Sequence, residues 1–151
     1  QDTTVFKFLN DKDTIKVGGL VCYESVFPTF PNYFVDRGAQ FLTVLTNDSW
    51  YGKLSGPYQH KEFANLRAVE NRRAVVRCAN GGVSCLINKF GVTEVETEMF
   101  TRTHLVVDVP LNNEKTFYTK NPSIIPVLSS AFGLWIFGIN ILLWMKKKFK
   151  L

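Results

Sequence analysis

The residues best suited to covalent chemistry stand together as Cys22, Tyr23 and Glu24, directly after the apolar run GGLV. A thiol at the carboxyl end of a strand, followed by a turn into a helix, can be exposed and favoured as the nucleophilic thiolate. The backbone N–H of Tyr23 would then point into the same space and stabilise an oxyanion. Glu24 shares the face of Cys22 on a continuing strand, whereas a sharp turn leaves its direction open. The pattern fits acyl transfer, and its alternative is a buried, inert cysteine at a strand end.

The other chemically active residue types give weaker signals. Cys78 and Cys85 bring the cysteine count to three, with no zinc-type spacing, and each lies in an apolar strand-like run where inert buried thiols are common. A disulfide framework is therefore not expected, although a Cys78–Cys85 bridge stays open. His60 falls at the start of a predicted helix, where we expect a capping or packing role.

The elements that would position these residues alternate along the first 109 residues. Strands are predicted at 3–9 and 14–24, separated by the turn NDKD, and a short helix at 32–39 closes at Gly38. A buried strand at 40–47 leads through a loop at 48–60 into a helix over 59–73. Strands follow at 74–79, 83–88, 90–99 and 103–109. This order predicts an α/β or α+β layered domain.

The helix predicted over 59–73 has apolar residues at helical spacing. Phe63, Leu66 and Val69 recur along it, and Ala64 and Ala68 fill the same side. We therefore expect this side to pack on the sheet.

Charge and composition restrict the partners. The 151 residues carry a net charge of +5 and are 46% hydrophobic, enough for a packed core. Four of the eighteen basic residues are Lys146, Lys147, Lys148 and Lys150, so the first 145 residues are close to neutral. No basic cluster is evident on the predicted domain, and a nucleic-acid partner is not expected.

The C-terminal part predicts a transmembrane helix. Residues 123–145 carry no charge, and 23 residues of helix span about 34 Å, enough for the hydrocarbon core of a bilayer. Trp144 lies at the charged end, where interfacial aromatic residues gather, and the basic tail at 146–151 indicates the cytoplasmic side. Residues 110–122 are predicted as a linker. The alternative is a buried helix of a soluble domain.

Several motifs resemble a known family. GGLVCYE, LTNDSWYG, GPYQHKEFANLRAVENRRAVVRCANGG and INKFG resemble, in this order, the second half of a nitrilase-superfamily (carbon–nitrogen hydrolase) domain. Within that superfamily, the loop NDSWYGKLSGPYQH and the terminal span resemble the apolipoprotein N-acyltransferases of bacterial envelopes. The resemblance implies the C-terminal part of a nitrilase-like α-β-β-α sandwich at 1–109, followed by one transmembrane helix.

The resemblance also implies roles for individual residues. Cys22 matches the nucleophile, Tyr23 the residue whose amide serves the oxyanion, and Glu24 an acidic residue needed for activity. Asn47, Asp48, Trp50 and Tyr51 match a segment near the active-site mouth, and Asn47, Trp50 and Tyr51 become candidate substrate-binding residues. The alternative is structural: Asn47 and Asp48 cap the turn, and Trp50 packs beneath it. The residues Arg67, Glu70, Arg72 and Arg73 match the helix pattern, where scaffold ion pairs of Glu70 with Arg67 or Arg73 are expected.

The resemblance finally implies a reaction, and it implies that two catalytic residues of the family are not among the residues present here. An acyl group passes from a membrane phospholipid through a Cys22 thioester to the N-terminal amine of a diacylglyceryl-cysteine lipoprotein, without metal or organic cofactor, on the extracytoplasmic side of the bacterial inner membrane. The family's base is a glutamate, which together with a lysine lies farther upstream of the cysteine than the 21 residues present here. With Gln1 in place of Met, we therefore expect a C-terminal portion that is inactive without the N-terminal half. The rival functions are a small-amide or nitrile hydrolase and a non-catalytic membrane-tethered binding module.

Overall fold

The computed structural model describes residues 3–9 and 13–149. Most of the predicted NDKD turn lies outside the described residues. The chain divides into two compact units, Gln1–Lys120 and Asn121–Leu151, and each is described by itself.

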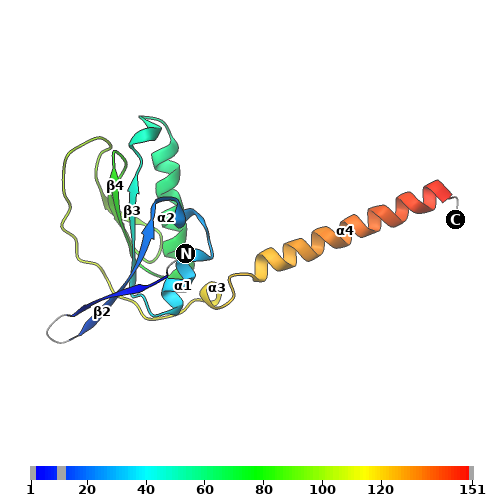
Figure 1. Cartoon of the computed structure of the whole chain (residues 1–151), viewed down its shortest axis with the longest axis horizontal. Coiled ribbons are helices and arrows are strands. Elements are labelled where there is room, and N and C mark those ends of the chain that lie inside the picture. The colour runs from blue at the N-terminus through cyan, green and yellow to red at the C-terminus, as the bar shows by residue number, and fades with distance from the viewer. Residues whose placement is uncertain (1–2, 10–12, 150–151) are drawn as a thin grey trace. The chain divides into compact units, whose positions relative to one another are not determined.

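The first unit is built on one mixed sheet (Figure 1). Its six strands lie side by side in chain order: β1 (Val5–Leu9), β2 (Thr14–Val21), β3 (Phe41–Asn47), β4 (Val75–Asn80), β5 (Cys85–Ile87) and β6 (Thr93–Glu96). The central strands β2, β3 and β4 are parallel, and the outer pairs are antiparallel. The carboxyl ends of the three parallel strands therefore meet at one edge of the sheet, which is where open α/β sheets place their binding sites.

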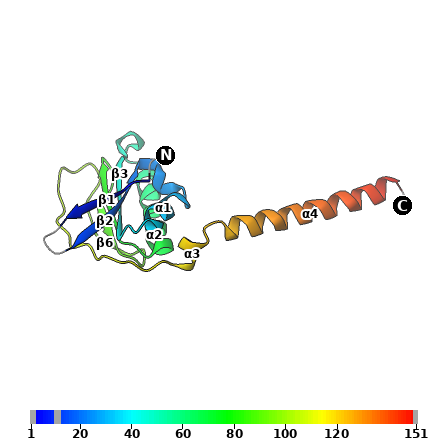
Figure 2. The ribbon, with the colours of Figure 1, turned by 60° about the horizontal axis from the view of Figure 1, so that its bottom comes forward.

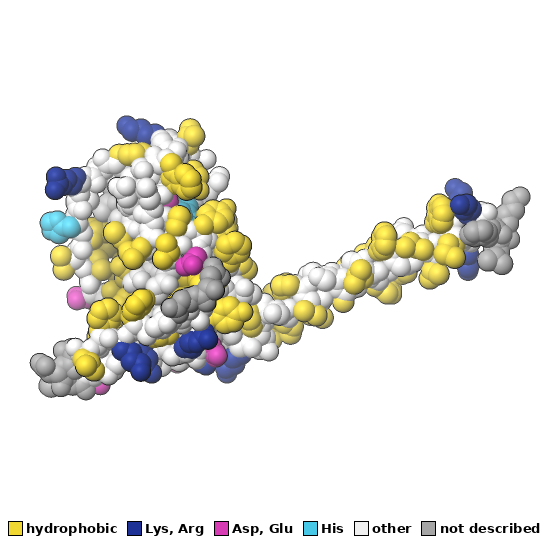
Figure 3. All heavy atoms as spheres, viewed as in Figure 1, with side chains coloured by type: hydrophobic (Ala, Val, Ile, Leu, Met, Phe, Trp, Pro, Cys, Tyr) yellow, Lys and Arg dark blue, Asp and Glu magenta, His cyan; other side chains and the backbone are white. Residues whose placement is uncertain are grey.

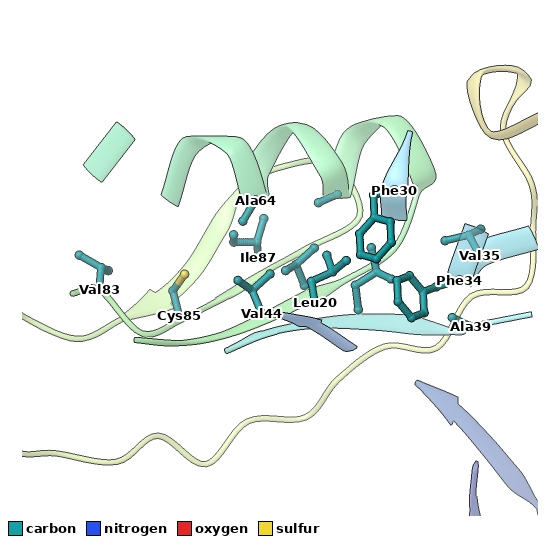
Figure 4. Close-up of a cluster of buried hydrophobic side chains, with 13 residues drawn as sticks. Leu20, Phe30, Phe34, Val35, Ala39, Val44, Ala64, Val83, Cys85 and Ile87 are labelled. Atoms are coloured by element: carbon teal, nitrogen blue, oxygen red, sulfur yellow. The ribbon is translucent and has the colours of Figure 1, made fainter. Parts of the chain in front are cut away.

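Two helices cover one face of this sheet, α1 (Phe30–Asp36) and α2 (Gly56–Asn71) (Figure 2). Figure 4 shows Ala64 of α2 above Leu20, Val44 and Ile87, residues of three different strands. All four side chains are fully buried. The predicted mixed α/β layering is therefore confirmed.

The face that α2 turns to the sheet agrees only in part with the one predicted. Leu66 is 50% exposed and Val69 is 39% exposed, whereas Ala64 and Ala68 are fully buried. Buried polar residues complete the inner face at positions His60, Arg67 and Asn71. Small alanines let the helix approach the sheet closely, and the polar residues are held by hydrogen bonds. The apolar periodicity therefore placed Ala64 and Ala68 correctly and Leu66 and Val69 wrongly.

The predicted strand at 103–109 is wrong. Residues 101–116 contain no helix or strand. Leu105 and Val107 line a cavity together with Val76 and Leu86 of the sheet, so the segment contacts the sheet without joining its hydrogen bonding. Apolar residues alternate along 103–109 because one side of this segment faces the sheet and the other side does not.

The same face, which no described helix of the first unit covers, carries an apolar groove of about 640 Å³ over β1, β2 and β3. Phe6, Val21 and Leu45 line it and are each more than half exposed.

The segment ahead of the second unit is hydrogen-bonded to the domain. Arg73 Nη1 donates to the carbonyl oxygen of Glu114 at 2.6 Å, and the buried Thr119 Oγ1 donates to Asn71 Oδ1 at 3.0 Å. Thr119 lies on the short helix α3 (Phe117–Lys120). The compact unit accordingly extends to Lys120.

The second unit contains the helix α4 (Ile124–Phe149). Its residues 124–148 are long and apolar enough to cross a membrane, by length and composition, and none of the apolar window is buried. Figure 3 shows hydrophobic side chains along the helix and lysines at its far end. The helix continues through Lys146, Lys147 and Lys148, part of the predicted basic tail, and residues 150–151 lie outside the described residues. Lys148 Nζ lies 4.9 Å from the centre of the Trp144 ring, close enough for a cation–π contact.

Candidate active site

Cys22 stands where the chain turns sharply out of the sheet. Strand β2 ends at Val21, and the 3₁₀ helix η1 (Cys22–Val26) begins at the cysteine. Cys22 has a φ of 52°, a left-handed conformation that non-glycine residues rarely adopt and that is concentrated at functional sites. Its side chain is partly accessible. A strand-to-helix turn that leaves the thiol accessible is a geometry that suits a nucleophile.

The two residues after Cys22 take different positions. Glu24 turns back toward the strand, and its Oε2 accepts a hydrogen bond of 2.8 Å from the backbone N–H of Val21. The open direction of Glu24 is thereby settled: its carboxylate closes the turn. Tyr23 is 53% exposed, and its backbone N–H lies in the first turn of η1, where N–H groups have no partner within the helix. Such a group can serve a developing oxyanion.

A buried polar network lies beneath this turn. Ser25, fully buried, donates from Oγ to the carbonyl oxygen of Cys22 at 3.0 Å. His60 Nε2 lies 3.3 Å from both Ser25 Oγ and the Cys22 carbonyl oxygen. His60 Nδ1 lies 2.9 Å from Asp48 Oδ1. His60 is therefore a buried residue of α2 that forms hydrogen bonds, which agrees with the predicted packing role.

Asp48 is the centre of the network and has no exposed surface. It forms an ion pair with the equally buried Arg77, and its Oδ1 accepts a hydrogen bond of 3.0 Å from Thr46 Oγ1. Burial raises the pKa of Asp48, but the hydrogen bond from His60 and the positive charge of Arg77 outweigh it and hold the pKa below its ordinary value. Asp48 is therefore a carboxylate at neutral pH.

The turn between β4 and β5 is shaped around Asp48. A Cβ on Gly82 would lie 2.5 Å from Asp48 Oδ2, and a Cβ on Gly81 would lie 2.7 Å from Ser49 Cα. Gly81 also has a φ of 69°. The NGG turn therefore needs glycine at both positions to close over the carboxylate.

The loop after β3 holds the candidate substrate-binding residues. Asn47 Oδ1 accepts hydrogen bonds from Ser49 N at 3.2 Å and from Asn80 Nδ2 at 3.1 Å, which confirms its turn-building role. Trp50 does not pack beneath the turn, since it is 76% exposed. Tyr51 is half-buried, with its ring centre 5.6 Å from that of Trp50. Parallel pairing of β2 with β3 brings this loop to the same sheet edge as Cys22.

The remaining predicted residues have structural positions. Cys78 is exposed, contrary to the prediction that it is buried, because its strand position points away from the helix layer. Cys85 is buried, and burial raises the pKa of its thiol to about 11. Both thiols are free, so no Cys78–Cys85 bridge forms. Arg67 pairs with Glu70 at 3.0 Å, as expected.

Arg73 does not pair with Glu70. Instead, its Nε donates to the backbone carbonyl oxygen of Ala39 at 2.7 Å. Arg72 ends α2 in a left-handed conformation and donates to the carbonyl oxygen of Lys89 at 3.3 Å.

Sequence reasoning missed Ser25 and Arg77. A signal for Arg77 was present, because an arginine inside the apolar strand AVVRCA needs a buried counter-charge. Asp48, at the end of the neighbouring strand, supplies it. Within the described ranges, no group of three or more His, Cys, Asp or Glu residues is placed to hold a metal ion.

Comparison with known proteins defines the class. The carbon–nitrogen hydrolase family model matches residues 2–139, and the chain belongs to this family. It is 44% identical over 127 residues to an apolipoprotein N-acyltransferase of Chlorobaculum tepidum, covering 83% of this chain and 24% of that protein. It is 38% identical over 105 residues to an apolipoprotein N-acyltransferase of Geobacter metallireducens, covering 70% of this chain and 20% of that protein. The predicted family resemblance is confirmed.

Solved structures confirm the fold. A mutant amidase from Nesterenkonia sp. AN1, with acrylamide added at its active-site cysteine, superposes with a TM-score of 0.51 at 23% identity. The match covers 66% of this chain and 39% of the amidase. The chain spans a quarter or less of the length of these two relatives, 24% of the Chlorobaculum protein and 20% of the Geobacter protein.

Proposed function

We propose that this chain is the nucleophile-bearing part of an acyltransferase that moves a fatty acyl group from a membrane phospholipid to the N-terminal amine of a diacylglyceryl-cysteine lipoprotein. The observation that carries the proposal is the left-handed Cys22 at the carboxyl edge of the parallel strands. Its support is the sequence identity to proteins named apolipoprotein N-acyltransferase.

The proposed reaction has two steps. The Cys22 thiolate attacks the ester carbonyl of the phospholipid, the C–O bond breaks, and the lysophospholipid leaves as an alcohol after taking a proton. The backbone N–H of Tyr23 stabilises the oxyanion formed on the way. The lipoprotein α-amine then attacks the thioester, an amide bond forms, the C–S bond breaks, and a base accepts the amine proton. No metal or organic cofactor is needed.

The base and a lysine for the oxyanion are assigned to the N-terminal half of the enzyme, as the family resemblance implies. Among the described residues, no hydrogen bond is formed to the Cys22 thiol, and Glu24 is engaged with the Val21 N–H. Asn47, Trp50 and Tyr51 are proposed to contact substrate at the site mouth. The exposed Trp50 offers an apolar surface to lipid there.

The helix α4 supports a membrane location for the proposed reaction, because both substrates carry lipid. We assign it to the bacterial inner membrane, with the lysines at the end of α4 on the cytoplasmic side and the domain on the extracytoplasmic side.

One other enzymatic function has a specific observation in its favour. The fold is shared with an amidase, and a small-amide hydrolase would use the same cysteine. A helix long and apolar enough to cross a membrane has no role in that reaction, which favours the acyltransferase. The non-catalytic binding module stays as a third reading.

A paired substitution tests the proposal. Acyl transfer from phospholipid to a diacylglyceryl peptide is measured with the full-length protein that carries this chain, in detergent. Cys22→Ser should abolish transfer, whereas Cys78→Ser, at the other accessible thiol, should leave it unchanged. Hydrolysis of small amides without acyl transfer would establish the amidase, and full activity of Cys22→Ser would exclude Cys22 as the nucleophile.

A further inference from the structure

The reaction steps proposed above use none of the side chains in the buried network beneath Cys22. Ser25 lies on η1, His60 on α2, Asp48 directly after β3, and Arg77 on β4. Each of these four side chains is no more than 3% exposed. Four polar side chains buried together at one point of a small domain are expensive to desolvate, unless they are fully paired or serve a purpose.

The network is not a second catalytic centre. Ser25, His60 and Asp48 have the order of a serine-hydrolase triad, with contacts of 3.3 Å and 2.9 Å. However, Ser25 has no exposed surface, and its hydroxyl donates to the carbonyl oxygen of Cys22. A substrate carbonyl has no access to this oxygen, so a nucleophilic role is excluded.

What the network does contact is the backbone of the nucleophile. Ser25 Oγ and His60 Nε2 both converge on the Cys22 carbonyl oxygen, at 3.0 Å and 3.3 Å. That carbonyl belongs to the peptide unit whose other end is the Tyr23 N–H, so its orientation sets the direction of the N–H. The left-handed conformation of Cys22 is costly for a residue with a side chain and persists only when its surroundings impose it.

Charge fixes the orientation of the histidine ring. Because Asp48 is held as a carboxylate, it accepts a hydrogen bond from His60 Nδ1–H, which places Nε2 beside Ser25 Oγ and the Cys22 carbonyl oxygen. Nε2 donates to that oxygen when the ring carries a proton on both nitrogens. Arg77 in turn holds Asp48, and its Nε donates to the carbonyl oxygen of Val83 at 3.2 Å. The chain of contacts thus runs from β4 to the turn that carries the nucleophile.

We propose that Ser25, His60, Asp48 and Arg77 are positioning residues that hold the Cys22–Tyr23 peptide unit in the orientation needed for oxyanion stabilisation. This inference rests on the proposed role of Cys22 as the nucleophile. The network acts through the backbone and touches neither substrate nor the thiol.

Two reactions of Cys22 separate positioning from packing. Acylation by p-nitrophenyl acetate passes through an oxyanion, whereas alkylation by iodoacetamide does not. Both rates are measured at Cys22 by peptide mass mapping in the full-length protein in detergent. Ser25→Ala and His60→Asn should lower the ratio of acylation to alkylation by about tenfold or more, because small misalignments of catalytic groups have effects of this size.

Matched variants make the test specific. His60→Gln places an amide near the position of Nε2 and should restore the ratio to within about threefold of wild type. Thr119→Val removes a buried hydroxyl three helical turns away along α2, at its contact with Asn71, and should lower stability without changing the ratio. Equal changes in both rates, or a ratio unaffected by His60→Asn, would overturn the proposal.

Deuterium exchange is a third measurement, and it tests the positioning role even if the proposed thioester reaction fails. If the wild-type thiol is alkylated but never acylated, the thioester reaction fails. Deuterium exchange then decides on positioning: faster exchange of the peptide covering residues 20–27 in Ser25→Ala and His60→Asn supports it, and unchanged exchange overturns it.

Discussion

Replacing Asp48 by Asn should destabilise the domain far more than the same change at an exposed ion pair. Asp48 and Arg77 are both without exposed surface, so the substitution leaves a guanidinium charge buried beside a neutral amide. Breaking a buried pair by removing one partner costs about 3–5 kcal/mol, and we expect the lower end because Asn still accepts a hydrogen bond from His60. The matched control is Asp36→Asn, at the pair with Lys115, where Asp36 is 71% exposed. The control should cost less than about 1 kcal/mol.

The assay is urea denaturation of the chain in mild detergent, followed by circular dichroism. The sign of the pH dependence follows from the lowered pKa of Asp48. Its stabilising contribution is present above the ordinary value of 3.8 and is lost as the pH falls through the lower folded value. Wild type should therefore lose stability more steeply than Asp48→Asn on acidification below about pH 4. If Asp48→Asn costs no more than Asp36→Asn, the reasoning on the buried network is refuted.

Three further predictions follow from the same structure. Gly82→Ala should lower the melting temperature and the acylation rate of Cys22 together, because the new Cβ would lie 2.5 Å from Asp48 Oδ2; an unchanged melting temperature would contradict the packing. Iodoacetamide at pH 8 should label Cys78 rapidly and Cys85 only after unfolding, because Cys85 is buried with a pKa of about 11; equal labelling in mass mapping would contradict this. The uncovered sheet face should cause aggregation of the isolated chain, and Leu45→Ser should reduce the aggregation seen by light scattering; equal scattering from both proteins would contradict this.

Local patterns predicted the elements of this fold but not which residues face each other. The strand at 40–47, the helix after the loop and the turn at NGG were identifiable because hydrophobic runs and glycines are local signals. The inner face of α2 was identifiable only in part, since Ala64 and Ala68 lie on it as predicted but hydrogen-bonded polar residues complete it in place of Leu66 and Val69. The segment at 103–109 alternates like a strand because it rests on a sheet face, a tertiary contact that no local pattern distinguishes from pairing.

The candidate site also has one part that local sequence patterns predicted and one part that they did not. A strand end near Cys22 could be predicted, because an apolar run stops at the cysteine, but the strand predicted over 14–24 ends already at Val21. The network below Cys22 could not be predicted, since His60 meets Ser25 across 35 positions and Arg77 meets Asp48 across 29. Such contacts depend on the parallel pairing of β3 with β4 and on the packing of α2 over them.

The most direct test of the account is intact-mass spectrometry of the full-length protein after incubation with phosphatidylethanolamine in detergent. We predict an added mass of one acyl chain, removed by hydroxylamine and mapped to Cys22. No adduct on a folded protein whose Cys22 still reacts with iodoacetamide would contradict the thioester and favour the amidase or a binding module.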